Sequence, residues 1–286
     1  MRRTMMEDGA RLWLPPLSLA GCVRAGFLRD TRGLALQGEE LDTYYPASPL
    51  VVLTWTWGGS AEWLGTPGFV PPSPGFRVWP VGLSGPVTGP CHLRVAAEGV
   101  HGLQLMFLPD AFRALTGIEA GPLVNRCVDA ATLLPPEWQA WAVSLAGLSN
   151  DDARLAAIEA FIAPRWQALA ASSHTGQRYS QWLEALAVRA AGSTAGRSLR
   201  QFERRIKTWA GIPMRELRAV SRGEQAFLAA VADGPAPSWA ELAVEADYAD
   251  QSHLCRETRR LTGFSPEDLR RRMRSELAFW PYRLWT

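Results

Sequence analysis

Basic and polar side chains recur at helical spacing within residues 250–262, and they define the chemistry open to this part of the chain. In a helix over that range, one side carries Ser252, Arg256, Arg259 and Arg260. The opposite side carries Leu254, Thr258 and Leu261. An arginine on a helix in the major groove of DNA can bond a guanine bidentately or grip a phosphate. The pattern therefore indicates nucleic-acid recognition, although such a face on an isolated helix is more commonly just solvated.

Capping residues place this basic helix second in a pair of helices. Ser238 and Glu241 form a capping box that starts a preceding short helix. Asp250 is a suitable N-cap for the basic helix, and Gly263 is a suitable glycine at its end. Two short helices joined by a turn of about three or four residues, the second with a basic outer face, form the layout of a DNA-reading helix-turn-helix.

The same stretch resembles the signature of the AraC/XylS family of bacterial transcription regulators. The residues that carry the resemblance are the aromatic Tyr248, the run DQSH at 250–253, Arg256 and the run GFSP at 263–266. Two positions depart from the family pattern. Asp247 stands where the family usually has glycine, a change that aspartate tolerates because it adopts left-handed conformations more readily than most residues. Thr258 stands where a phenylalanine is usual, so we expect one smaller contact in the core there.

A second unit of the same kind precedes the first. Residues 198–211 read SLRQFERRIKTWAG, with a capping box at Ser198 and Gln201 and basic residues opposite an apolar stripe. The helix ahead of it spans Tyr179 to Ala190, and a linking helix spans Arg215 to Val231, weakened by Gly223. At about 1.5 Å per residue the linking helix is roughly 25 Å long, which suits the ~34 Å repeat of successive major grooves. The family resemblance likewise implies that one chain reads two adjacent groove segments.

These two helices supply the candidate DNA-contacting residues. The family resemblance also makes the residues at the start of the second helix candidates, because base contacts cluster there. We expect His253 to contact either a base or a phosphate. The full set is Arg200, Gln201, Glu203, Arg204, Lys207, Gln251, Ser252, His253, Arg256, Arg259 and Arg260.

Charge is distributed unevenly along the 286 residues. Residues 1–177 hold 12 Lys+Arg against 15 Asp+Glu, whereas residues 178–286 hold 18 against 13. A basic C-terminal half suits a nucleic-acid partner for that half alone. The four cysteines lack CxxC or zinc-finger spacing, which favours free thiols in a reducing compartment. No apolar run reaches the length of a membrane span, and charges and prolines interrupt the N-terminus, so we expect a cytoplasmic protein.

The N-terminal half follows a different pattern, rich in glycine and proline up to about residue 110. The clearest strands are Leu50 to Trp57, Phe76 to Leu83 and Gly102 to Leu108, and a long helix is expected from Asp151 to Leu169. We predict a two-domain α+β protein, with a β-rich cupin-like barrel or sandwich and trailing helices followed by an all-α domain. The small polar run at 170–176 marks the boundary. The expected domains are an N-terminal sensor or dimerisation domain, 1–172, and an AraC-type DNA-binding domain, 173–286.

Four tryptophans on or near the expected strands are candidates for a ligand pocket: Trp55, Trp57, Trp63 and Trp79. Ordinary core or rim packing is the more common role of tryptophan and is the favoured alternative. His92, Glu98 and His101 lack the close His-x-His spacing of a cupin metal site, and no catalytic motif stands out, so we expect no metal, no cofactor and no enzyme activity. The alternative function is a small-molecule-binding cupin-like enzyme or sensor that uses the helical domain as a scaffold.

Residues 40–165 also resemble the sensor domain of a subset of the same family. The matching features are Tyr45-Pro46, Trp57-Gly58 and the run FLPDAFRALTG at 107–117. The resemblance implies that this half binds a small-molecule effector or pairs with a second copy to form a homodimer. The partners expected are therefore double-stranded DNA, an effector, a second copy of the chain and, for an activator, RNA polymerase. The aromatic residues at 279–285 would be a liability if exposed, so we expect them to dock on one of the domains.

Overall fold

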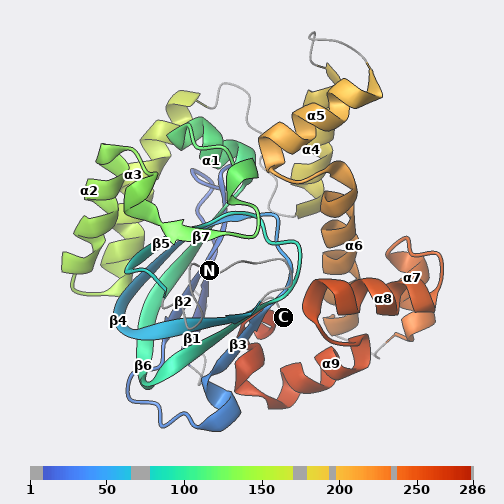
Figure 1. Cartoon of the computed structure of the whole chain (residues 1–286), viewed down its shortest axis with the longest axis horizontal. Coiled ribbons are helices and arrows are strands. Elements are labelled where there is room, and N and C mark those ends of the chain that lie inside the picture. Colours follow the sequence, from blue (N-terminus) through green and yellow to red (C-terminus); the bar gives the residue numbers. More distant parts are fainter. Residues whose placement is uncertain (1–8, 66–77, 170–178, 193–197, 233–236, 285–286) are drawn as a thin grey trace.

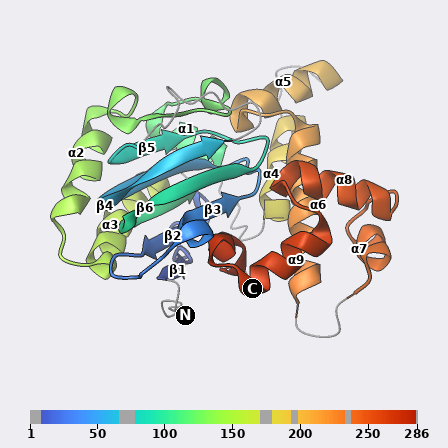
Figure 2. The same cartoon turned by 60° about the horizontal axis from the view of Figure 1, so that its bottom comes forward.

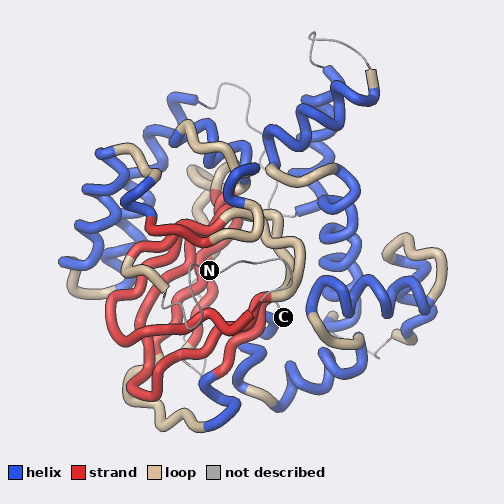
Figure 3. The backbone as a smooth tube through the Cα atoms, in the orientation of Figure 1, coloured by secondary structure: helices blue, strands red, loops and turns tan. Residues whose placement is uncertain are grey.

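The computed structural model describes residues 9–65, 78–169, 179–192, 198–232 and 237–284 (Figure 1). The β-strands gather in one half of the molecule and the C-terminal helices in the other, as the tube in Figure 3 shows. The two-domain α+β class expected from the sequence is confirmed. Residues 170–178 lie outside the described part, so the boundary between 172 and 173 stays a prediction.

One antiparallel sheet forms the N-terminal half. Its strand order is β1-β2-β6-β4-β5-β7, and β3 pairs with the N-terminal part of β6 beyond the stretch that pairs with β2. The strands are β1 (Ala10–Trp13), β2 (Val23–Asp30), β3 (Asp42–Tyr45), β4 (Val51–Gly65), β5 (Val81–Ser84), β6 (Cys91–Phe107) and β7 (Cys127–Asp129).

The central strands β4 and β6 are longer than the sequence predicts. The predicted strand at 50–57 is only the first part of β4, and the one at 102–108 is only the end of β6. The Gly58-Gly59 pair reads as a turn, but the strand continues through it with register shifts that bend the sheet. Gly59 has a φ of +71°, and a Cβ there would lie 1.8 Å from the Gly99 carbonyl oxygen, so this bend requires glycine. The predicted strand at 76–83 is shorter, because β5 begins at Val81 and residues 76–77 lie outside the described part.

The two faces of the sheet pack against different partners. Along β4, Leu53 and Trp55 are fully buried on the face covered by helices α1 to α3, and the Trp55 indole donates a hydrogen bond to the Ala142 carbonyl (2.9 Å). Val52 and Thr54 alternate to the other face and line a cavity toward the C-terminal helices. The covering helices are α1 (Pro109–Thr116), α2 (Pro136–Ser144) and α3 (Asp151–Leu169), the last with the predicted bounds.

Helices make up the C-terminal half, in the order expected. They are α4 (Tyr179–Gly192), α5 (Leu199–Ala210), α6 (Met214–Val231), α7 (Trp239–Glu245), α8 (Gln251–Thr262), α9 (Pro266–Ser275) and α10 (Trp280–Arg283). Short 3-10 turns complete the described chain at Gly38–Leu41, Gly121–Leu123, Ala130–Thr132, Leu145–Gly147 and Leu277–Phe279. Within the described ranges, no helix is both long and apolar enough to cross a membrane.

The aromatic C-terminal segment docks on the sheet, as the exposure argument predicts. Trp280 is buried, donates a hydrogen bond to Thr43 Oγ1 on β3 (3.2 Å) and meets Phe27 edge to face at 5.7 Å between ring centres. Phe279 and Tyr282 are buried beside it, whereas Trp285 lies outside the described residues. The segment therefore ties the end of the helical half to the N-terminal half.

Candidate nucleic-acid interface

Helix α5 begins and ends where its capping residues dictate. The Ser198 hydroxyl accepts a hydrogen bond from the Gln201 amide (3.3 Å), and the Gln201 side chain accepts one from the Ser198 amide (3.3 Å). Gly211, with a φ of +80°, closes the helix. The helix buries Ile206 and Ala210 and leaves its outer residues Arg200, Arg204 and Lys207 exposed.

Helices α7 and α8 form the second unit with the same devices. The Ser238–Glu241 capping box is present, and hydrogen bonds from Ser238 hold the pKa of the Glu241 carboxyl below its ordinary value. Asp247 adopts a left-handed conformation with a φ of +58°, as expected for a residue in place of glycine. The Asp250 carboxylate then accepts a hydrogen bond from the His253 amide (2.6 Å) and starts α8. Gly263 ends α8 with a φ of +85°.

Helix α6 lies between the two units and separates them. Figures 1 and 2 show α5 and α8 near opposite ends of α6, both with their N-terminal ends directed away from the sheet. The 18 residues of α6 make a rod of about 27 Å. The Arg260 guanidinium bridges Glu216 on α6 (2.9 Å) and Glu257 on its own helix (2.6 Å). Gly223 lets α8 approach, since a Cβ there would lie 2.7 Å from Leu261 Cδ1.

The candidate DNA-contacting residues are not equally available. Seven are exposed on the outer faces of the two helices: Arg200, Arg204, Lys207, Gln251, Ser252, Arg256 and Arg259. Gln201 serves the α5 cap, Glu203 is half-buried, and Arg260 is engaged by its two carboxylates. His253 is half-buried, with Nδ1 accepting from the Ala249 amide (3.4 Å) and the ring edge-on to Tyr248, so the structure gives it a role in the turn.

Sequence reasoning missed one cation in the same region. Arg215 is exposed at the start of α6 and lines a shallow groove between the two units together with Lys207 and Arg259. The N-terminal half also lines this groove, through Thr88, Gly89, Pro90, Gly121 and Val124. The sequence does carry a signal for Arg215. The residue lies in the first turn of the linking helix, directly after Pro213 and next to the first unit.

Polar contacts fasten both units to the N-terminal half without covering their basic faces. The Asp110 carboxylate on α1 accepts a hydrogen bond from the Trp182 indole (2.9 Å) and pairs with Arg189, both on α4. At the second unit, the Ala47 amide donates to the Leu261 carbonyl at the end of α8 (2.7 Å). Both recognition helices therefore keep their arginines exposed while their other sides are anchored.

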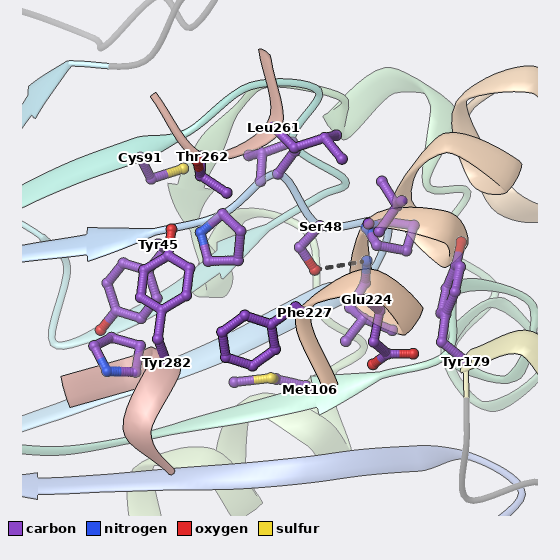
Figure 4. A pocket seen from close by; sticks show the side chains of 18 of the residues that line it. Tyr45, Ser48, Cys91, Met106, Tyr179, Glu224, Phe227, Leu261, Thr262 and Tyr282 are labelled. Carbon is purple, nitrogen blue, oxygen red and sulfur yellow. Dashed lines mark hydrogen bonds between the residues drawn. The ribbon is translucent and has the colours of Figure 1, made fainter. Parts of the chain in front are cut away.

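A cavity of about 280 Å³ lies between the sheet and helices α6, α8 and α9 (Figure 4). Of the four candidate tryptophans, Trp63 and Trp79 line it, but Trp55 and Trp57 do not. Trp57 packs instead on the helix-covered face, where the Arg154 guanidinium lies 4.2 Å from its ring centre. The four therefore do not form one pocket, because Trp55 and Trp57 share a face of β4 and the register shifts beyond them turn Trp63 toward the other.

The histidines considered for a metal site have separate carboxylate partners. His92 Nε2 lies 3.2 Å from Asp42 Oδ1, and His101 Nε2 lies 3.0 Å from Asp151 Oδ1. Asp151 also pairs with Arg154 (2.8 Å); although burial opposes ionisation, the His101 and Arg154 contacts hold the pKa of Asp151 below its ordinary value. Across the described residues, no group of three or more His, Cys, Asp or Glu side chains is placed to hold a metal ion.

Comparison with known proteins identifies the C-terminal part of the chain. Residues 191–272 match a family model described as a helix-turn-helix domain. This part of the chain is a helix-turn-helix domain, the kind of domain that the sequence predicts there. No curated protein matches the chain at a significant level.

Among solved structures, ToxT from Vibrio cholerae is similar to this chain. The P21 crystal form of ToxT is 11% identical in sequence, and the alignment covers 79% of this chain and 92% of the ToxT chain with a TM-score of 0.37. ToxT bound to (E)-4-(8-methylnaphthalen-1-yl)but-3-enoic acid has 11% identity, 85% and 95% coverage and a TM-score of 0.38. Unsaturated fatty acid-bound wild-type ToxT has 10% identity, 80% and 93% coverage and a TM-score of 0.37. Likeness at this level transfers no residue's role to this chain.

Proposed function

We propose that this protein is a sequence-specific transcription regulator of the AraC type. Its C-terminal helix-turn-helix domain would read two adjacent major-groove segments with α5 and α8. The observation that carries the proposal is the joint presentation of Arg200 and Arg204 on α5 with Arg256 and Arg259 on α8, all exposed at opposite ends of one linking helix. The roughly 27 Å length of α6 supports a separation near one helical turn of DNA, about 34 Å.

Affinity and sequence specificity come from different contacts at such an interface. Arginine and lysine contacts to phosphates supply affinity that falls steeply with salt, whereas a few side chains at base edges choose the sequence. Arg204 and Arg256 are our candidates for base contacts. Arg215 and Lys207 are candidates for phosphate contacts, because they line the groove between the two units.

The N-terminal half, within the proposed domain 1–172, would control the helical domain 173–286 through an effector or through pairing with a second copy. This proposal is supported by the contacts that join Asp110, Ala47 and Thr43 to the helices of both units and to the C-terminal segment. For an activator, RNA polymerase would be the further partner. A change in the N-terminal half could then alter the spacing or the order of α5 and α8.

Fluorescence anisotropy of the full-length chain with duplexes from the promoter region beside its gene tests the proposal. Arg204→Ala and Arg256→Ala should each weaken the cognate complex by about 1–3 kcal/mol and relax the choice of base at one position. Arg274→Ala is a matched control, because Arg274 is exposed on α9, outside the two recognition helices, and should leave affinity unchanged. Equal losses on every sequence would assign the two arginines to phosphates, and no binding to any duplex would refute the function.

A further inference from the structure

The cavity between the two halves of the molecule has walls from both. The sheet contributes Leu93 and Met106, and the helices contribute Phe227, Leu254 and Leu261. Figure 4 shows Phe227 and Met106 near the middle of the side chains drawn, with Tyr282 and Tyr179 on opposite sides. At about 280 Å³ the cavity is close to the lower end of known ligand pockets, roughly 300–1,000 Å³, and its walls are mainly apolar.

A buried hydroxyl without a partner lies in this apolar lining. Tyr282 is only 4% exposed, and its hydroxyl has no hydrogen-bond partner among the described residues. Burial raises the pKa of this hydroxyl far above its ordinary value, so it remains a neutral donor. Leaving such a group unpaired in the interior is unfavourable, and an occupant with an accepting oxygen would remove that penalty. The Tyr179 hydroxyl, also buried and also without a hydrogen-bond partner among the described residues, has its pKa raised by burial and further by the nearby Glu224 charge.

The charged side chains in the lining already have partners. Arg24 and Glu224 pair with each other (3.1 Å), and Arg270 pairs with Glu267 (2.6 Å) and lies over the Trp239 ring. A ligand carboxylate would therefore have to break an existing ion pair to be neutralised. Burying an unpaired charge in this lining would be costly, so the cavity disfavours an anion.

We propose that this cavity binds an uncharged, mainly aliphatic molecule whose single oxygen accepts a hydrogen bond from the Tyr282 hydroxyl. The ligand would touch the sheet, α6 and α8 at once, so its binding energy would favour the docked arrangement of the two halves. This inference deepens the proposed effector control and rests on it only for the effect on DNA binding. The site itself stands on the cavity, the unpaired hydroxyl and the paired charges.

Thr258 offers a way to close the cavity. It lines the cavity from α8, where its short side chain is half-buried. The smaller threonine leaves space that a phenylalanine ring would occupy. Thr258→Phe should therefore place an aromatic ring inside the cavity and exclude a ligand from it.

The test uses two probes of equal chain length, 2-octanone and octanoate, titrated into the full-length protein by isothermal calorimetry. The ketone should bind saturably, and octanoate at least about tenfold more weakly, because it brings a charge into an apolar lining. Tyr282→Phe should weaken ketone binding by roughly three- to tenfold, as expected for the loss of one neutral hydrogen bond. Thr258→Phe should abolish it. Tyr248→Phe is the matched control, because it removes another buried hydroxyl outside the cavity.

Several results would overturn the inference. They are octanoate binding as tightly as the ketone, no saturable binding of the ketone, or ketone affinity unchanged in a Tyr282→Phe protein whose melting temperature matches the parent. The titrations need no DNA, so they succeed or fail independently of the anisotropy measurements. A protein that binds the ketone but no duplex would refute the proposed function and leave the site intact.

Discussion

The two helix-turn-helix units use the same local devices but are embedded differently in the molecule. The first shares one continuous core with the sheet, to which Trp182 and Leu186 of α4 and Ile206 of α5 all belong. The second has a small core of its own, built from Leu242, Leu254 and neighbouring residues of α6 and α7. Capping and periodicity therefore specify each helix, while the surrounding structure decides how firmly each unit is held.

This difference separates a fixed reading helix from a more independent one. Because α5 packs in the shared core, moving it requires opening contacts of the N-terminal half. Helix α8 reaches the N-terminal half through the Ala47–Leu261 hydrogen bond and, beyond α9, through the docked C-terminal segment. The second unit is thus where a change at the interdomain cavity would act most directly, since Leu254 and Leu261 line that cavity.

The largest effect should come from a matched pair of core deletions, Leu186→Ala and Leu242→Ala. Both leucines are about equally buried, at 1% exposed, and each change should cost about 2–5 kcal/mol. We expect Leu186→Ala to lower the temperature of the main unfolding transition. Leu242→Ala should instead speed amide hydrogen exchange mainly within residues 239–262. Calorimetry and exchange mass spectrometry measure the two. If Leu242→Ala loosens the sheet as strongly as Leu186→Ala does, the two cores are one cooperative unit.

Asp110→Ala should have the next largest effect, confined to the first unit. It removes the acceptor of the Trp182 indole and the charge partner of Arg189, which should weaken the docking of α4 by about 1–3 kcal/mol. Exchange across 179–192 would measure the change. Asp152→Ala is the control, because its pair with Arg11 involves a half-exposed carboxylate and should cost about 0–1 kcal/mol. Equal effects of the two changes would argue against Asp110 as an anchor.

Removing the N-caps should distinguish the units at a smaller scale. Ser198→Ala and Asp250→Ala should each cost their helix about 0.5–2 kcal/mol. The shared core holds α5, so exchange should rise more in 251–262 of Asp250→Ala than in 199–210 of Ser198→Ala. DNA affinity should follow the same order. The reverse order would mean that α5 is the less firmly held helix.

Tyr248 should have the smallest effect on the stability of the second unit near neutral pH. Its effect should grow in alkaline solution. Burial in the second unit raises the pKa of its hydroxyl from 10.0 to about 12. The stabilisation is present below pH 10 and is lost as the pH rises toward 12, because the unfolded chain then ionises more readily than the folded one. Tyr248→Phe should lack this loss in exchange measurements on 239–262. An identical alkaline decline in the variant would assign it to another group.

Much of the helical half could be predicted because its signals act over a few residues. The boundaries of α3, α5 and α8 follow from capping residues and apolar spacing, and Asp247 takes its left-handed conformation from the turn it occupies. The strands were harder to delimit. Gly58-Gly59 marks a turn by local rules, yet pairing with β6 carries β4 through it.

The roles of individual site residues depended on contacts between distant segments. Sequence placed Arg260 and His253 among the DNA-contacting residues, but Glu216 engages Arg260 and the turn at Ala249 engages His253. Gly223 read only as a weak point in α6, whereas its missing Cβ makes room for Leu261. The sequence by itself determined which helices form and which faces are basic, because helix caps and periodicity are local. Only the tertiary structure decided which tryptophans line the cavity and which arginines remain available, because burial and ion pairing arise between residues far apart in the chain.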